Sequence, residues 1–294
     1  SKQFLNDNPG FLRRGPENSL LIAKKNYVIS NVPAIQPQSA FVVLNHQTGQ
    51  LLALIGGRNA EGKLLYNRAM YPRQPGSTIK PLTIFTPAID SGEYSPSTVI
   101  DDRPVYLSGN PNVRWPLNWY ESYGNQFKYH GLVTLRETLS WSMNVPAAII
   151  GKHFGVPTMV RYLEDYGITT LVKDGPYNDM NLAALSLGGM TRGIKPVEMA
   201  AAYATIANKG MHNSVSTYTR VTNARGEVLL EKKPESRFVI DENVAYILTD
   251  MMRTSVEVGV ASRAKITPGN DVYQVSGKTG STDEDIDAWF TGFT

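Results

Sequence analysis

Apolar residues lie in short runs near both ends of the sequence. Residues 40–44 and 51–55 are two apolar runs around a turn that contains Gly49. Two such runs around a short glycine-containing loop are typical of a β-hairpin. A second hairpin is predicted for residues 217–221 and 227–231. Further strands are predicted near the carboxyl end of the chain, over residues 272–275 and 289–293.

The middle of the chain has the pattern of a helical region. Helices are predicted over residues 77–89, 132–142, 145–154, 157–166, 195–208 and 241–253. Thr134 is followed three residues later by Glu137, which is the spacing of a capping box at a helix start. Residues 92–130 are rich in Pro, Gly, Asn and Tyr and are expected to be irregular. Strands at both ends with helices between them predict a mixed α/β fold.

Composition narrows the class of protein. The 294 residues are 41% hydrophobic, which is enough for a sizeable core and excludes a disordered chain. The net charge of +3 is too weak to indicate a nucleic-acid partner. The absence of cysteine excludes disulfides, zinc-thiolate sites and a cysteine nucleophile. The four histidines have no metal-ligand spacing, so we expect no metal site, and nothing in the sequence implies another cofactor.

Two features suggest that the chain is a piece of a longer protein. It begins at Ser1, and it ends at Thr294 directly after a strand-like run over residues 288–293. A domain rarely stops inside a strand, so we expect a domain over residues 38–294 that is truncated at its carboxyl end. Residues 1–37, with several prolines and glycines, are expected to be a lead-in or linker. The sequence has no run near the roughly 18–20 apolar residues that span a bilayer.

The first chemical motif is Ser-x-x-Lys, formed by Ser77 and Lys80 at a predicted helix start. Residues three apart share a helix face, so the Lys80 amine could reach the Ser77 hydroxyl. A lysine whose pKa is lowered by burial can activate a serine nucleophile. The helix start would also favour a developing oxyanion at Ser77. The alternative for this motif alone is an N-cap serine followed by a surface lysine.

Two further motifs follow along the chain. Ser142 and Asn144 form Ser-x-Asn at a predicted helix end, which alone could be a simple turn. Lys278, Thr279 and Gly280 form Lys-Thr-Gly. A phosphate-binding loop would need a glycine at position 272, which is Val272, so nucleotide binding is excluded.

The order Ser-x-x-Lys, Ser-x-Asn, Lys-Thr-Gly is that of β-lactamases and penicillin-binding proteins. Over residues 38–294 the sequence resembles the transpeptidase domain of a class A (bifunctional) penicillin-binding protein. The resemblance extends beyond the three motifs to residues 67–69, 73–81, 186–189 and 287–293. It implies a β-lactamase/transpeptidase-like α/β fold, with an antiparallel sheet flanked by helices. A helical subdomain would hold Ser142 and Asn144.

The resemblance also implies parts that this chain lacks. In the family, a membrane anchor and a glycosyltransferase domain precede the transpeptidase domain, so residues 1–37 would be the linker from them. The family's last strand and its carboxyl-terminal helix are expected to be missing as well. The resemblance places the protein at the cell membrane, on its extracytoplasmic face, with membrane contact only through the absent anchor.

The activity that the resemblance implies is cross-linking of peptidoglycan by a serine D,D-transpeptidase. Ser77 would attack the penultimate D-Ala carbonyl of a stem peptide that ends in D-Ala-D-Ala, and form an acyl-enzyme. Lys80 would be the base, and Ser142 would relay a proton to the leaving amine. Lys278 would add positive potential that holds Lys80 neutral, because neighbouring ammonium groups disfavour each other's charge. β-Lactams would acylate Ser77, and cell-wall synthesis proteins would be partners.

The resemblance assigns substrate binding to a second group of residues. Asn144 would bind the amide backbone of the substrate, and the hydroxyls of Thr279 and Thr282 would bind its carboxylate. The strand through Gly280 would pair with the substrate as an added strand. The backbone N–H groups of Ser77 and Ser281 would form the oxyanion hole.

Three alternatives to the transpeptidase remain. A serine β-lactamase would need a Glu-x-x-Leu-Asn segment, which Glu164 and its neighbours do not form. A penicillin-recognising sensor domain would be acylated and stay acylated. A structural domain that has lost activity would not need the reactive positions, which are all intact.

A cluster of aromatic residues lies before Ser142. It is either a covering loop packed on the core or a rim that contacts substrate: Trp115, Trp119, Tyr120, Tyr123 and Tyr129.

Overall fold

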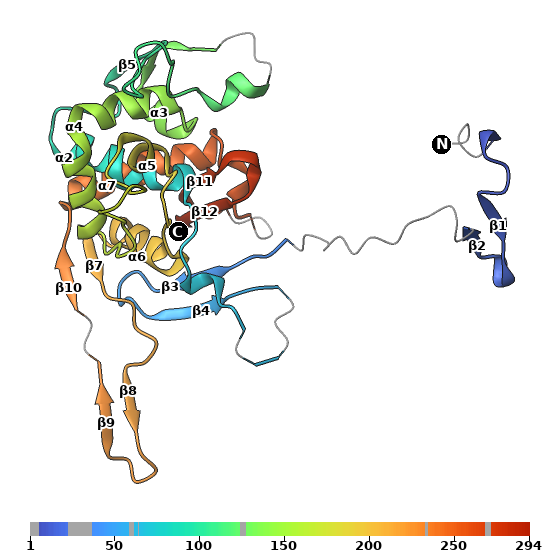
Figure 1. Cartoon of the computed structure of the whole chain (residues 1–294). Coiled ribbons are helices and arrows are strands. Elements are labelled where there is room, and N and C mark those ends of the chain that lie inside the picture. Colours follow the sequence, from blue (N-terminus) through green and yellow to red (C-terminus); the bar gives the residue numbers. More distant parts are fainter. Residues whose placement is uncertain are drawn as a thin grey trace. The chain divides into compact units, whose positions relative to one another are not determined.

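The computed structural model describes residues 6–22, 37–58, 62–63, 65–123, 128–232, 235–267 and 272–294. The chain divides into two compact units, Ser1–Gln38 and Ser39–Thr294 (Figure 1). In the first unit, β1 (Leu12–Arg14) and β2 (Leu20–Ile22) form a short antiparallel hairpin around the helical turn η1 (Pro16–Asn18). The sequence pattern did not predict this hairpin.

The second unit contains most of the structure. Its α-helices are α2 (Thr86–Asp90), α3 (Leu135–Ser140), α4 (Asn144–Asp165), α5 (Leu182–Leu187), α6 (Pro196–Ala207) and α7 (Glu242–Glu257). Its shorter helical turns are η3 (Arg68–Met70), η4 (Gly76–Ile79), η5 (Pro81–Phe85), η6 (Trp119–Tyr123), η7 (Ser262–Ala264) and η8 (Asp283–Asp285).

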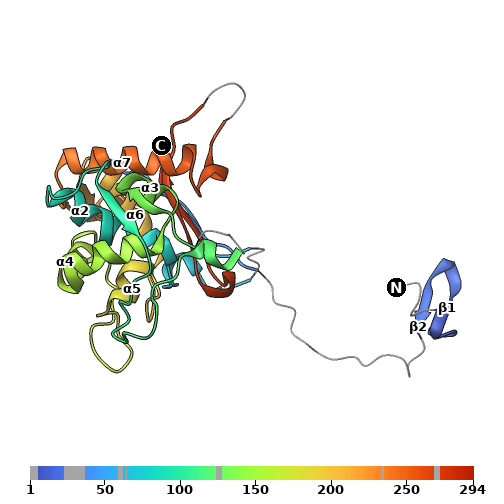
Figure 2. The same ribbon diagram turned by 90° about the horizontal axis from the view of Figure 1, so that it is seen from above.

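Every strand ladder in the described part of the second unit is an antiparallel pair. The pairs are β3 (Phe41–Leu44) with β4 (Leu51–Ile55), β5 (Val99–Asp102) with β6 (Gly131–Thr134), β7 (Met211–Asn213) with β10 (Ser236–Phe238), β8 (Arg220–Thr222) with β9 (Val228–Glu231), and β11 (Ser276–Ser281) with β12 (Ala288–Phe293). The predicted mixed α/β class is therefore confirmed. Helices α6 and α7 pack against these pairs, α6 on β3 and β12 and α7 on β11 (Figure 2).

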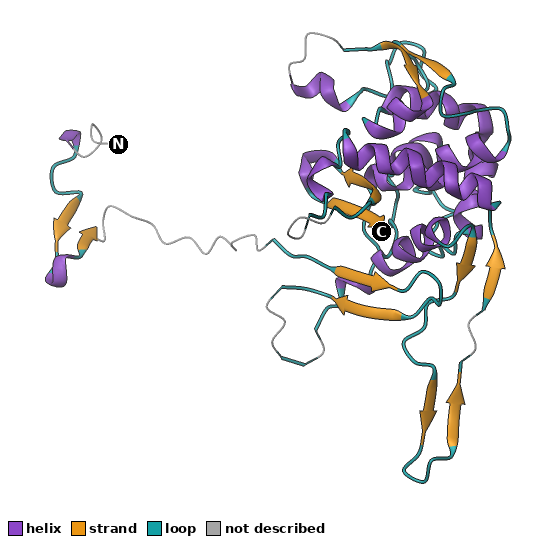
Figure 3. Ribbon diagram, turned by 180° about the vertical axis from the view of Figure 1, so that it is seen from behind, coloured by secondary structure: helices purple, strands orange, loops and turns teal. Residues whose placement is uncertain are grey.

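Several sequence predictions are confirmed at the level of single elements. Both predicted hairpins form, as β3–β4 and β8–β9 (Figure 3). Thr134 caps α3 in a capping box with Glu137. The predicted helices over residues 145–154 and 157–166 lie in α4, where Gly155 has a non-helical backbone (φ 78°, ψ 162°) that separates the two helical segments.

Other boundaries differ from the prediction. The predicted strand over residues 272–275 is wrong, because the strand begins at Ser276 and contains the Lys-Thr-Gly motif itself. The predicted helix over residues 132–142 begins with the end of β6, and only Leu135–Ser140 is helical. The predicted irregular segment over residues 92–130 contains β5, whose inward residues are Ile100 and Asp102. An apolar pattern does not reveal a strand that buries a carboxyl group.

The core lies between the long helices. The segment after Ser77 is a π-helical turn, η5, in which all five residues are buried, and it packs against α4. A π-turn widens a helix and occurs frequently at functional sites. The main cluster of buried side chains contains Leu82, Phe85, Leu139, Ile150, Met159, Tyr166, Met199, Tyr203, Leu248 and Met251. The predicted helix over residues 77–89 is therefore three joined pieces, η4, η5 and α2.

Candidate active site

The turn that carries Ser77 is held by glycines on both sides. Gly76, at φ +52°, lies so close to β11 that a Cβ atom there would be 2.3 Å from the carbonyl oxygen of Ser281. A Cβ on Gly280 would be 2.3 Å from the carbonyl oxygen of Pro75, and one on Gly188 would be 2.1 Å from that of Gly76. Backbone can approach backbone this closely only without side chains. The Ser77 turn is therefore fixed between β11 and the end of α5.

Lys80 is fully buried and turns toward the second motif. Its Nζ atom donates hydrogen bonds to the carbonyl oxygens of Ser142 (3.0 Å) and Met143 (3.1 Å), and to Oδ1 of Asn144 (2.7 Å). The backbone N–H of Lys80 donates to the carbonyl oxygen of Ser77, but among the described residues no hydrogen bond joins the Lys80 amine to Ser77. Spacing along the chain predicted contact with Ser77, whereas the fold uses the amine to join the first and second motifs.

Two buried lysines determine the charge of the site, and neither has a carboxylate partner among the described residues. Lys278 is fully buried, and burial lowers its pKa to about 7. Its Nζ atom donates to the carbonyl oxygen of Thr279 at 3.0 Å. Burial lowers the pKa of Lys80 well below 10.5, and the positive charge of Lys278 lowers it further. Both effects disfavour the ammonium form of Lys80.

Ser142 has a backbone conformation that is unusual for a residue with a side chain. Its φ angle is +55°, in the left-handed region. This turn follows α3 and presents two successive carbonyl oxygens, those of Ser142 and Met143, to Lys80. Ser142 itself is 7% exposed. Such strain persists only where the surrounding structure over-determines it, and it clusters at functional sites.

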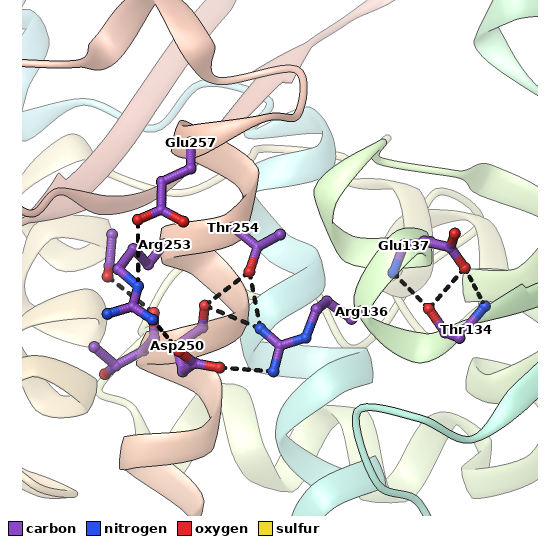
Figure 4. A network of polar contacts seen from close by, with 9 residues as sticks. Thr134, Arg136, Glu137, Asp250, Arg253, Thr254 and Glu257 are labelled. Atoms are coloured by element: carbon purple, nitrogen blue, oxygen red, sulfur yellow. Dashed lines mark hydrogen bonds and ion pairs between the residues drawn. The ribbon is translucent and has the colours of Figure 1, made fainter.

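Contacts between α3 and α7 hold the Ser142 turn in place. Arg136 on α3 donates to the Asp250 carboxylate (2.6 Å) and to Thr254 Oγ1 (2.8 Å) on α7 (Figure 4). Arg253 donates to the other carboxylate oxygen of Asp250 at 2.6 Å. The Ser276 hydroxyl, at the start of β11, donates to the carbonyl oxygen of Thr249 at 2.9 Å. Helix α7 therefore joins the element that precedes Ser142 to the strand that carries Lys278.

Asn144 begins α4 and has both ends of its side-chain amide engaged. Oδ1 accepts from Lys80, and Nδ2 donates to the carbonyl oxygen of Leu117 at 2.9 Å. Its backbone N–H donates to Oδ1 of Asn118 at 3.1 Å. Sequence reasoning did not single out Leu117 or Asn118, which lie in the segment predicted to be irregular.

The third motif lies on β11, beside the Ser77 turn. Lys278 and Gly280 are buried, Thr279 is half-buried and Ser281 is exposed. Within the described residues β11 forms a ladder with β12 alone.

Thr282, directly after β11, is linked through Asp287 to Arg73, which lies four residues before Ser77. Its hydroxyl accepts from the backbone N–H of Asp287 at 3.0 Å. The Asp287 carboxylate in turn pairs with Arg73 at 2.8 Å. The predicted site residues of all three motifs are therefore brought to one region of the second unit.

The aromatic residues before Ser142 divide between the core and the surface. Tyr120 is buried, and Trp119 is 39% exposed and donates through Nε1 to the carbonyl oxygen of Trp141 at 2.9 Å. The side chain of Tyr123 lies outside the described residues. Tyr129 hydrogen-bonds Arg114, which also pairs with Glu121. The segment before Ser142 therefore packs over the second motif through hydrogen bonds as well as aromatic side-chain contacts.

The described residues contain no group of three or more metal-ligating side chains that could hold a metal ion. A search of the same residues found no helix with the length and apolar character needed to cross a membrane.

A comparison with family models decides the family. Residues 39–294 match the model of the penicillin binding protein transpeptidase domain. The chain belongs to this transpeptidase family. The transpeptidase match includes all three motifs and excludes the hairpin of the first unit.

Curated relatives of this transpeptidase domain are longer proteins. Penicillin-binding protein 1A of Clostridium novyi is 36% identical over 279 residues, covering 94% of this chain and 31% of the relative. Penicillin-binding protein 1A of Clostridium botulinum is 34% identical over 271 residues, covering 88% of this chain and 31% of the relative. The chain spans about a third of the length of these relatives.

Solved structures share the fold. Penicillin-binding protein 1A from Haemophilus influenzae has a TM-score of 0.72 at 22% identity, covering 96% of this chain and 44% of that one. Penicillin-binding protein A from M. tuberculosis, as an imipenem acyl-enzyme complex, has a TM-score of 0.71 at 22% identity, covering 87% of this chain and 64% of that one. The transpeptidase domain described here therefore has the fold of penicillin-binding proteins.

Proposed function

We propose that this domain is a serine D,D-transpeptidase that cross-links peptidoglycan stem peptides through an acyl-enzyme on Ser77. The observation that supports this most is the placement of Lys80, a buried amine of lowered pKa that joins the Ser77 turn to the Ser142–Asn144 segment. A base for a serine nucleophile must be neutral at working pH, and burial beside Lys278 favours the neutral amine.

Acylation would begin with proton transfer from Ser77 Oγ to Lys80 Nζ. A neutral amine has two N–H bonds, so it can keep two of the three contacts seen at Nζ and direct its lone pair at Ser77. Ser77 Oγ then forms a bond to the penultimate D-Ala carbonyl carbon. The negative charge that develops on the carbonyl oxygen is held by the backbone N–H groups of Ser77 and Ser281.

The peptide bond to the last D-Ala then breaks, and its nitrogen needs a proton. Ser142 supplies this proton by relay from Lys80, and D-Ala leaves. The amine of a neighbouring stem peptide then attacks the ester and loses a proton to Lys80, the bond from the acyl carbon to Ser77 Oγ breaks, and Lys80 returns the proton to Ser77 Oγ. The positive charge of Lys278 helps to orient Ser142 throughout.

Substrate binding falls to the residues that flank the nucleophile. The edge of β11 opposite β12, through Gly280, would add the substrate as an antiparallel strand. Asn144 retains one N–H beyond its bond to Leu117, which can bind the substrate amide backbone. The hydroxyls of Thr279 and Thr282 can donate to the terminal carboxylate.

β-Lactams would acylate the same serine, since the related M. tuberculosis protein is an imipenem acyl-enzyme in its solved structure. The substrate places the domain on the extracytoplasmic face of the cell membrane, where cell-wall synthesis proteins would be its partners. Membrane attachment would come from an anchor outside this chain. A glycosyltransferase domain would accompany it in the longer protein.

The test is the intact mass of the protein after mixing with a penicillin. We expect one lasting adduct on the wild type and on Ser97→Ala, a control at an exposed serine, and none on Ser77→Ala. The acylated fraction is then compared with cross-linking of a donor stem peptide and an acceptor amine. Rapid drug hydrolysis without an adduct would instead indicate a β-lactamase. A lasting adduct without peptide cross-linking would indicate a sensor domain.

A further inference from the structure

The carboxyl group of Asp102 is buried beside the second motif and has no cation among its described partners. Asp102 is the last residue of β5 and is 1% exposed. Oδ1 accepts from Asn118 Nδ2 at 2.8 Å, and Oδ2 accepts from the Tyr120 hydroxyl at 2.5 Å and the His130 backbone N–H at 2.8 Å. Burying a carboxyl group is costly even with hydrogen bonds. The contacts of Asn118 show what the carboxyl group contributes to the site.

Asn118 carries the effect of Asp102 to the start of α4. Its Oδ1 atom accepts from the backbone N–H groups of Asn144 and Val145, both at 3.1 Å. The N-cap residue of α4, Met143, offers no capping side chain. Asn118 therefore caps α4 from a distant part of the chain. Because Asp102 holds Nδ2, the amide oxygen must face the helix.

The same segment also holds the side chain of Asn144. Leu117, next to Asn118, accepts from Asn144 Nδ2 through its carbonyl oxygen at 2.9 Å. With Nδ2 held there, Oδ1 of Asn144 points at Lys80 Nζ, 2.7 Å away. A continuous chain of hydrogen bonds thus runs from Asp102 through Asn118 and Asn144 to Lys80.

We propose that Asp102 and Asn118 are positioning residues for acylation of Ser77. They fix the start of α4, and thereby the Asn144 amide and the amine of Lys80, without touching a reacting atom. The inference rests on the proposed function for its kinetic consequences, whereas the capping of α4 can be measured separately.

The decisive variant is Asn118→Asp. Its carboxylate can still accept from the two α4 amides, but it also faces the carboxyl group of Asp102. Two carboxyl groups this close ionise together only at a cost, so they share a proton with a pKa above the usual carboxyl range. At low pH the shared proton preserves the geometry, and we expect near wild-type acylation. As pH rises and the proton is lost, acylation should fall by about 10-fold to 100-fold, the effect of misplacing catalytic groups.

Two control variants separate positioning from folding. Asn118→Ala should acylate about 10-fold to 100-fold more slowly at every pH. Tyr120→Phe removes another donor to Asp102 but keeps the Asn118 contact, so its pH profile should follow that of the wild type. Rates are expressed relative to the wild type at each pH. The other ionisable side chains that face this pair are the same residues in both proteins: Arg114, Tyr120, Glu121, Tyr129 and His130.

The second measurement does not depend on acylation. Hydrogen exchange of the Asn144 and Val145 backbone amides, followed by NMR, should be at least about 10-fold faster in Asn118→Ala than in the wild type, because both lose their acceptor. If the wild type forms no Ser77 adduct, the proposed function fails, and the exchange rates alone decide the positioning role. Unchanged exchange in Asn118→Ala overturns the inference. A pH profile of Asn118→Asp that follows the wild type overturns it as well.

Discussion

Two buried lysines dominate the site at the scale of single residues. Three other described lysines pair with carboxylates, as Lys195 does with Glu198 at 2.7 Å. Lys80 and Lys278 instead face carbonyl oxygens and an amide oxygen. Neutral acceptors stabilise an ammonium less than a carboxylate does, so burial dominates and both pKa values fall. A lysine of this kind can serve as a base near neutral pH.

We predict a bell-shaped pH dependence for acylation of Ser77. The rate rises with pH as Lys80 loses its proton and becomes a base, and it falls above about pH 7 as Lys278 loses its charge. The measurement is the acylation rate with a fluorescent penicillin between pH 5 and pH 10.

Two variants test which lysine causes the rise and which causes the fall of the acylation rate with pH. Lys278→Arg keeps its charge at alkaline pH and should remove the falling limb. Lys80→Ala should lower the rate by about 10²- to 10⁴-fold, the usual contribution of a general base. A wild-type profile that is flat across this range would contradict the assignment of both lysines.

At the scale of elements, the site depends on close backbone packing around η4. Gly76 lies against β11 and Gly188 lies against Gly76, so the turn has no space for side chains on either side. The predicted regular helix after Ser77 is instead a short turn, a π-turn and then α2. Pro81 and Pro87 lie at the starts of η5 and α2, and a proline has no backbone N–H for the regular helical hydrogen bond.

We predict that Gly76→Ala disrupts the site far more than Gly92→Ala. Both glycines have positive φ, at +52° and +74°, but a Cβ on Gly92 meets nothing within 4 Å. Gly92→Ala should therefore cost about 1–2 kcal/mol of stability from backbone strain alone, with acylation unchanged. Gly76→Ala adds a clash with the Ser281 carbonyl and should lower acylation at least about 100-fold.

The measurements for this pair are urea unfolding and the penicillin acylation rate of each folded variant. Equal acylation rates for the two alanine variants would show that the packing of Gly76 against β11 does not set the geometry of Ser77.

At the scale of the whole molecule, the site imposes a cost in stability. A lysine with a folded-state pKa of about 7 and an ordinary value of 10.5 binds a proton less readily when folded. Between these pH values the unfolded chain binds more protons, so the free energy of unfolding rises with pH through this range. Below pH 7 the cost of the buried charge is fully present. Function and stability therefore oppose each other at Lys278.

We predict that Lys278→Met is more stable than the wild type at pH 6 and that this advantage shrinks as pH rises to 10. The change in the difference should be on the order of a few kcal/mol. Urea unfolding of both proteins at pH 6, 8 and 10 measures it, and the comparison removes the titrations that they share. A difference that stays constant with pH, or that grows, would contradict the lowered pKa of Lys278.

Much of the architecture followed from the sequence. Short-range patterns correctly predicted the mixed α/β class, the β3–β4 and β8–β9 hairpins and the capping box at Thr134. The three motifs, in their order, predicted the transpeptidase family, which the family comparison confirms. These features depend on residues only a few positions apart, or on the identity of a few reactive side chains. These features can therefore be predicted from the linear sequence.

Tertiary structure alone decided how the motifs meet. Among the described contacts, the Lys80 amine hydrogen-bonds residues 62 to 64 positions away and not Ser77, three positions away. The burial that lowers the pKa values of both lysines depends on every element packed around them. Asp102 and Asn118 have no motif, and their place in the site comes from the path of β5 and the segment that caps α4. The sequence determined which chemical groups are present, and long-range packing decided which of them touch, because burial and hydrogen-bond geometry depend on contacts between distant residues.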